Sequence, residues 1–140
     1  MKKRKYIALD AALVVLTALL TIGALTFFSP CGIHDDGTYG TCHWAGAAVS
    51  GIGAVMLVLA VIHLIAGSQT AKKFVAVSMI PSALLSALIP GTLIPLCMMA
   101  GMRCNAVMRP SVTIISVVII IIALLDAVLR HRLEKSGDKR

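Results

Sequence analysis

Four long runs of apolar residues, separated by short polar segments, dominate the chain. They cover residues 7–28, 44–65, 74–95 and 112–129. A helix needs about 20 apolar residues to cross the hydrocarbon of a bilayer, since each residue adds about 1.5 Å. The pattern predicts an all-α integral membrane protein. We expect a single transmembrane domain over 1–140, a four-helix bundle made of two transmembrane hairpins.

Composition and charge agree with a lipid environment. Hydrophobic residues make up 59% of the chain and charged residues only 14%, whereas soluble domains are closer to half apolar and a quarter charged. The net charge is +7, but the basic residues stand at the ends of the apolar runs, so we expect no nucleic-acid partner. The first run exceeds the apolar core of about 7–15 residues in a cleaved signal peptide, so we expect it to be retained.

The lysines and arginines are distributed unequally along the chain. Four precede the first run, two lie between the second and third runs, and five follow the fourth, whereas only Arg103 and Arg109 lie in the remaining connections. Positive charge marks the cytoplasmic side of membrane proteins. The count predicts a multi-pass membrane protein with both termini cytoplasmic and the two other connecting loops outside.

Both predicted outer loops contain a pair of cysteines, Cys31 with Cys42 and Cys97 with Cys104. Disulfides persist on the oxidising side of a membrane. Four cysteines allow three connectivities, of which local pairing within each loop costs least in loop closure. We therefore expect two disulfide-bonded outer loops, while a bond between the loops would instead lock the hairpins together.

Side chains suited to ligand binding accompany these cysteines. The candidate outer-face interaction residues are His34, His43, Trp44, Met98, Met99, Met102, Arg103 and Asn105. Thiolate and thioether ligands select Cu(I), and mixed Cys/His sets favour Zn. Oxidised cysteines cannot ligate a metal, and adjacent Cys42 and His43 suit one tetrahedral site poorly. We predict no metal site and no cofactor; quinone, copper, zinc and haem are the alternatives.

Three ionisable residues fall near the cytoplasmic ends of the runs: Asp10, His63 and Asp126. Intramembrane ionisable groups suggest function by default, but each has a structural explanation here. We expect Asp10 to meet a lysine at its edge of the membrane (Lys5, Lys72 or Lys73). Asp126 is followed four residues later by Arg130, a favourable helical pair, and we expect His63 to be a neutral hydrogen-bonding group.

The second run contains small residues at helical spacing, which allow close approach of backbones in lipid. The predicted packing residues are Gly46, Ser50, Gly51 and Ala54. The third run contains Pro81 and Pro90, each of which removes a backbone hydrogen bond and is expected to kink the helix.

Several strings together resemble an uncharacterised family of small four-helix bacterial membrane proteins. These strings are Ser29-Pro30-Cys31-Gly32, Cys42-His43-Trp44, Pro95-Leu96-Cys97-Met98-Met99 and Arg103-Cys104-Asn105. The resemblance extends over roughly the whole chain, and its members have no assigned reaction. Their association with ABC-type exporter components implies an accessory role.

A four-helix chain with a cysteine pair in each of two outer loops also resembles the bacterial disulfide-bond oxidase, which passes electrons to quinone. That family has a Cys-x-x-Cys pair in the first loop, whereas ten residues separate Cys31 from Cys42 here. We therefore expect a non-enzymatic accessory or interaction subunit of a larger membrane assembly, such as an ABC-type exporter. Its partners would be the lipid bilayer and a membrane protein or further copies of the chain. The alternatives are a thiol–disulfide/quinone oxidoreductase and outer-face metal or haem binding.

Overall fold

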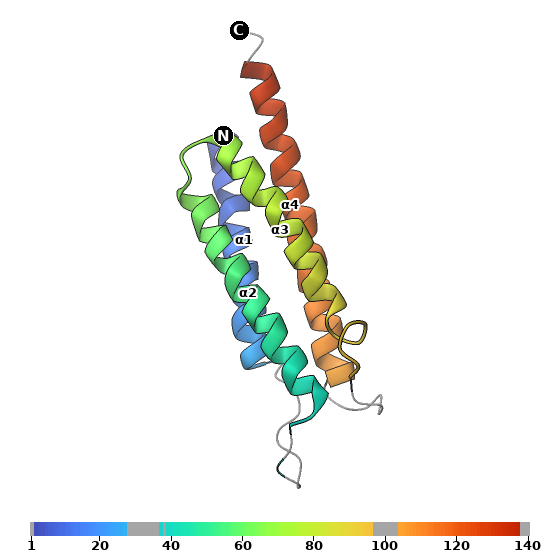
Figure 1. Cartoon of the computed structure of the whole chain (residues 1–140). Helices are drawn as coiled ribbons and strands as arrows, with labels where there is room; N and C mark the ends of the chain where they lie inside the picture. The colour runs from blue at the N-terminus through green and yellow to red at the C-terminus, as the bar shows by residue number, and fades with distance from the viewer. Residues whose placement is uncertain (1, 28–36, 38, 97–103, 138–140) are drawn as a thin grey trace.

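The computed structural model describes residues 2–27, 37, 39–96 and 104–137, and its regular structure in these ranges is helical (Figure 1). The helices are α1 (Lys2–Leu25), α2 (Thr41–Ile65), α3 (Gln69–Leu88) and α4 (Arg109–Gly137), with one π-helical turn, η1 (Cys104–Met108), directly before α4. The described residues contain no strand beyond one isolated bridge between Pro90 and Ile94. The prediction of an all-α fold is confirmed.

All four helices are long and apolar enough to cross a membrane. The candidate spans are Tyr6–Leu25, Thr41–Ile65, Gln69–Leu88 and Cys104–Leu133. Only 22% to 33% of the most apolar window of each span is buried within the bundle, so most of each helix faces outward. A helix that is apolar around its whole circumference belongs in lipid rather than in water, and the protein is a multi-pass membrane protein as predicted.

The helices form an elongated bundle in which both chain termini lie at the same end (Figure 1). The most extensive contacts join α1 to α2 and α3 to α4, and smaller contacts join α2 to α3 and α1 to α4. The chain therefore packs as two helical hairpins side by side. Their shared core contains Leu13, Leu20, Met56, Met79 and Ile119, all fully buried.

The third helix ends earlier than the predicted span 74–95. It stops at Leu88, and residues 90–94 form a turn in which the Gly91 N–H donates to the Ile94 carbonyl at 3.0 Å. Pro90 explains this end, because it has no N–H to donate within the helix, although Ile89 before it still has helical dihedral angles. Gly91 has a positive φ of 87°, a conformation that glycine adopts without strain. Pro81 lies within the helix as expected.

The two hairpin helices α1 and α2 approach closely where Gly53 faces Thr21. A Cβ atom at Gly53 would lie 2.7 Å from Thr21 Oγ1 and 3.3 Å from Thr21 Cα. The Thr21 hydroxyl cannot move freely, because it donates to the Thr17 carbonyl at 2.8 Å. Gly51, two residues earlier, faces outward, and a Cβ atom there would meet nothing within 4 Å.

These two glycines give a matched test of the packing. We expect Gly53→Ala to lower the free energy of unfolding by about 1–3 kcal/mol, as overpacking of a close contact does. Gly51→Ala should leave the unfolding free energy unchanged or raise it slightly, since Ala favours helix more than Gly does. Unfolding of both variants in neutral detergent measures this difference, and equal stability of the two would contradict the described α1–α2 contact.

Candidate functional site: a buried charge network

Five charged or titratable side chains from all four helices meet at the end of the bundle where the termini lie. Their sources are Asp10 in α1, His63 in α2, Lys72 in α3, and Asp126 and Arg130 in α4. All five are buried. We call this set the charge network.

Asp10 connects α1 to α3 and α4 through charged hydrogen bonds. Its Oδ2 accepts a hydrogen bond from Lys72 Nζ at 2.7 Å, and its Oδ1 accepts one from Arg130 Nη2 at 2.5 Å. The paired residues are 62 and 120 positions apart in the sequence. One carboxylate near the start of the chain therefore binds two cations of the second hairpin.

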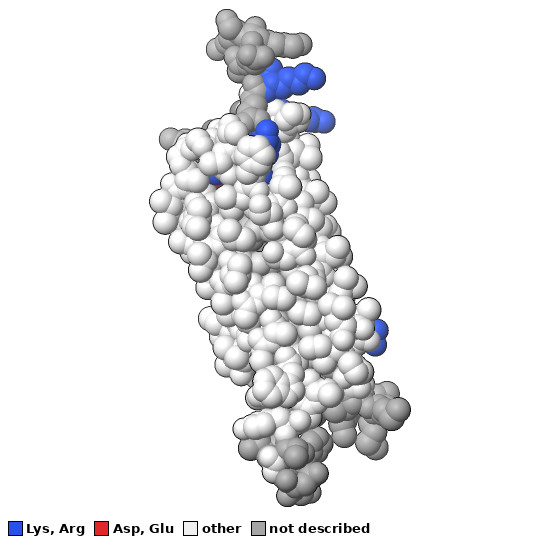
Figure 2. Space-filling view, viewed as in Figure 1, with Lys and Arg blue, Asp and Glu red and all other residues white. Residues whose placement is uncertain are grey.

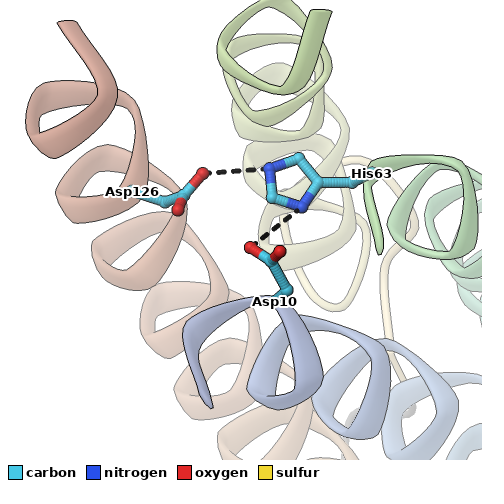
Figure 3. Close-up of side chains that lie close together, drawn as sticks. All are labelled: Asp10, His63 and Asp126. Carbon is cyan, nitrogen blue, oxygen red and sulfur yellow. Dashed lines mark hydrogen bonds and ion pairs between the residues drawn. The ribbon is translucent and has the colours of Figure 1, made fainter. Parts of the chain in front are cut away.

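The second carboxylate, Asp126, joins α4 to α2. Its Oδ2 accepts from Arg130 Nε at 2.7 Å and lies 2.9 Å from His63 Nε2. Helical geometry brings Asp126 and Arg130 together, since residues four apart lie on one face. The imidazole of His63 is held between the two carboxylates, because its other nitrogen, Nδ1, lies 3.5 Å from Asp10 Oδ1 (Figure 3).

Neutral groups complete the network at its edges. Arg130 Nη1 donates to Gln69 Oε1 at 2.6 Å, and Lys72 Nζ donates to the Leu64 carbonyl at 3.3 Å. The guanidinium carbon of Arg130 also lies 5.7 Å from the centre of the Tyr6 ring, within the range of a cation–π contact. Arg130 therefore contacts residues of α1, α3 and its own helix at once.

The charges of the network balance when His63 is neutral, because two carboxylates face Lys72 and Arg130. Balance matters, since each unpaired buried ion carries a desolvation penalty of several kcal/mol. Two buried polar atoms of the network make no hydrogen bond, His63 Nδ1 and Asp126 Oδ1.

The same residues also have one property of a metal site. Single ligand atoms of Asp10, His63 and Asp126 all lie within 4.8 Å of one another. However, the Asp10 oxygens and one Asp126 oxygen already accept charged hydrogen bonds from Lys72 and Arg130. A divalent ion would have to enter beside two fixed positive charges, so the donor set fits an ion-pair network and does not fit a metal centre.

Part of this network follows from the sequence. The predicted pairing of Asp10 with a lysine at its edge of the membrane is confirmed for Lys72, and the pair of Asp126 with Arg130 is confirmed at 2.7 Å. The role of His63 as a hydrogen-bonding group also agrees with its contact to Asp126. Sequence reasoning missed that these are one cluster and that Arg130 also binds Asp10. The sequence did contain a signal for the cluster, since all five positions lie at or beside the predicted cytoplasmic ends of the apolar runs.

The described residues of the two predicted outer loops lie at the opposite end of the bundle (Figure 1). Cys42 and Cys104 are buried there, whereas Cys31 and Cys97 lie outside the described residues. The pairings Cys31–Cys42 and Cys97–Cys104 therefore stay predictions, as do the redox and metal alternatives that depend on them.

The candidate interaction residues of that end are described only in part. The positions outside the described residues are His34, Met98, Met99, Met102 and Arg103. His43 stacks on Tyr39 with ring centres 4.3 Å apart and meets the edge of Trp44 at 5.8 Å. Trp44 is exposed and Asn105 is half-buried. The outer-face interaction role of these residues stays a prediction.

The four predicted packing residues of α2 divide between two faces. Gly46 is buried in the bundle and Ser50 is half-buried, whereas Gly51 and Ala54 are exposed. Ser50 donates to the Ala47 carbonyl of its own helix at 2.9 Å, so its hydroxyl is satisfied locally.

These features define a small, polytopic helical membrane protein whose buried charges are held within the bundle. The chain belongs to the family described as Domain of unknown function (DUF4418), whose profile matches residues 13–129. The resemblance to an uncharacterised family of small four-helix membrane proteins is confirmed. Comparison with curated proteins and with solved structures gives no match.

The network predicts unequal effects for two neighbouring arginines of α4. Arg130 is buried among its partners, and Arg132 is exposed. We expect Arg130→Gln to lower the free energy of unfolding by about 3–5 kcal/mol, because it leaves buried carboxylates without their cation. Arg132→Gln should change it by less than about 0.5 kcal/mol, as an exposed substitution does. Thermal unfolding in neutral detergent without added lipid measures both, and similar losses would show that Arg130 is not buried among ion pairs.

Proposed function

We propose that this protein is a non-enzymatic accessory subunit of a larger membrane assembly, with an ABC-type exporter as the expected class of partner. The buried ionisable groups of the described chain support a structural role. Asp10, Lys72, Asp126 and Arg130 bind one another across the four helices, and His63 contacts both carboxylates. Such an arrangement suits a rigid subunit that supports a partner.

The observation that carries the proposal is a line of small residues on the outward face of α2. Ala47, Gly51 and Ala54 are all exposed and follow one another at intervals of four and three residues, and the exposed Trp44 precedes them on the same face. Residues at these intervals share one face of a helix. The space over Gly51 is open, because an added Cβ would meet no atom within 4 Å.

Small residues of α2 lie both inside the bundle, where they pack against other helices, and on its outer surface. Gly46 and Gly53 are buried, and Gly53 is already used for close packing against Thr21. Ala47, Gly51 and Ala54 are exposed on the outside of the bundle, whose surface elsewhere carries larger Val, Leu and Ile side chains. In lipid, helices associate through close packing at small residues. We therefore propose that a helix of the partner packs on this face.

The proposal includes an orientation and a compartment. On the face shown in Figure 2, Lys and Arg gather at the end of the bundle where the chain termini lie, and the rest of its length shows little charge. By the positive-inside rule, this end is cytoplasmic. The protein would then lie in a bacterial cytoplasmic membrane, with the cysteine-containing loops and Trp44 on the outer side.

Substitution on the outward face of α2 tests the proposal. We expect the wild-type chain, isolated from its native membrane in mild detergent, to retain a second membrane protein. Gly51→Leu should reduce that retention at least about fivefold, since a bulky side chain prevents close helix approach. Val58→Leu is the matched control, because Val58 is exposed seven residues further along the same face and is not a small residue.

Unchanged retention by Gly51→Leu would overturn the assignment of this face. Isolation of the wild-type chain without any partner would overturn the accessory role. Recovery of further copies of this chain alone would replace it with a homo-oligomer. Melting temperatures of both variants equal to that of the wild type would show that the bundle itself is intact.

A further inference from the structure

A second surface feature lies between α3 and α4, outside the charge network. It is a groove of about 380 Å³. Its walls are almost wholly apolar: they consist of Phe74, Val77, Ala127 and Val128, together with carbon atoms of the basic residues Lys73, His131 and Arg132. Among the described residues, no acidic side chain lines it.

Basic residues close together in the sequence point in different directions beside this groove. Lys72 and Arg130 are buried and bind Asp10 and Asp126. Their neighbours Lys73 and Arg132 line the groove on the outside of the bundle. The buried pair is therefore bound by the carboxylates of the charge network, whereas Lys73 and Arg132 lie beside the groove.

Position along the helices places these cations at the level of lipid headgroups. The groove residues of α3 fall in the first turns of the span Gln69–Leu88, and those of α4 fall in the last turns of the span Cys104–Leu133. Phe74 agrees with this level, because aromatic rings collect at the membrane interface. Lys73 Nζ lies 5.6 Å from the centre of the Phe74 ring.

The apolar part of the groove continues toward the other end of the bundle. Val77 is followed on α3 by Leu84, and Val128 is preceded on α4 by Ile121, in each case seven residues away and exposed. Seven residues are close to two helical turns, so each pair shares one face. A hydrocarbon chain that enters the groove can thus lie along apolar surface on both helices.

We propose that this groove binds one anionic phospholipid. The phosphate would contact Lys73, His131 and Arg132, and an acyl chain would lie over Val77 and Val128. Basic pockets between transmembrane helices at the cytoplasmic side are a recognised way of binding anionic headgroups. A free phosphate would leave the apolar walls uncovered, whereas a phospholipid matches both parts. The proposal goes beyond the accessory role and does not depend on it, because it concerns other helices.

Native mass spectrometry of the full chain tests the proposal, with phosphatidylglycerol and phosphatidylcholine added separately in neutral detergent. We expect the wild-type chain to retain one phosphatidylglycerol and to retain phosphatidylcholine at least tenfold less well. Each cation near a membrane surface contributes about a fivefold change in affinity. Lys73→Gln with Arg132→Gln should therefore weaken phosphatidylglycerol binding roughly 25-fold.

Two further variants separate the site from total charge and from folding. Arg109→Gln with Lys135→Gln removes the same charge from exposed positions that do not line the groove, and it should retain phosphatidylglycerol like the wild type. Val128→Trp should weaken binding while all cations remain, because Val128 is 51% exposed and a larger ring fills the groove.

Three results would overturn the proposal. One is equal retention of phosphatidylglycerol by the groove variant and the charge-matched control. Another is retention of phosphatidylcholine by the wild type as strong as its retention of phosphatidylglycerol. The third is displacement of the lipid by millimolar inorganic phosphate together with unchanged binding in Val128→Trp, which would show a site for the anion alone.

Discussion

The neutralisation of buried charge within a bundle that lipid surrounds is the constraint on which this structure depends. Ionisable groups in a transmembrane segment are expensive and must pair with one another or reach water. Here Asp10 and Asp126 are each bound by a cation, and Arg130 binds both of them. Because the pairs connect α1, α3 and α4, and His63 adds α2, no single helix can move without breaking a buried contact.

Apolar packing alone would define this bundle less uniquely. In lipid there is little hydrophobic drive between helices, and sliding or rotating one apolar helix against another would cost little. The charge network fixes both the depth and the rotation of each helix at one end. Buried polar groups are known to specify register in other helical assemblies. We infer the same role here, and the outward directions of Gly51 on α2 and of Lys73 on α3 follow from it. The two proposed binding surfaces therefore depend on the network for their positions.

The sequence predicted the architecture well because hydropathy and length determine it. Four apolar runs became four helices, and Pro90 shows why the third helix is shorter than its apolar run: a proline ends the helix while the residues that follow remain apolar. The pair Asp10–Lys72 could be predicted because both residues lie at the same edge of the membrane. The pair Asp126–Arg130 could be predicted because its residues are four positions apart on one helix.

Which side chains face inward and which contacts form depends on the rotation of each helix about its axis. Apolar runs without amphipathic character do not encode this rotation. Gly51 and Gly53 are two residues apart and chemically identical, yet one is exposed and the other packs on Thr21. Likewise, Lys72 and Lys73 were equal candidates for Asp10, and only the folded bundle distinguishes them. The contact of Arg130 with Asp10 joins residues 120 positions apart, and their shared edge of the membrane indicates that they are near each other but not that they pair.

A double-mutant cycle between Asp10 and Arg130 tests the central claim most directly. The unfolding free energy is measured for the wild type, Asp10→Asn, Arg130→Gln and the double variant in the same neutral detergent. If the charge network joins the first helix to the last, the double variant will lose less than the two single losses together, with an interaction energy of at least about 1 kcal/mol. Additivity within about 0.5 kcal/mol would contradict the account, because that is the behaviour of residues without a shared contact.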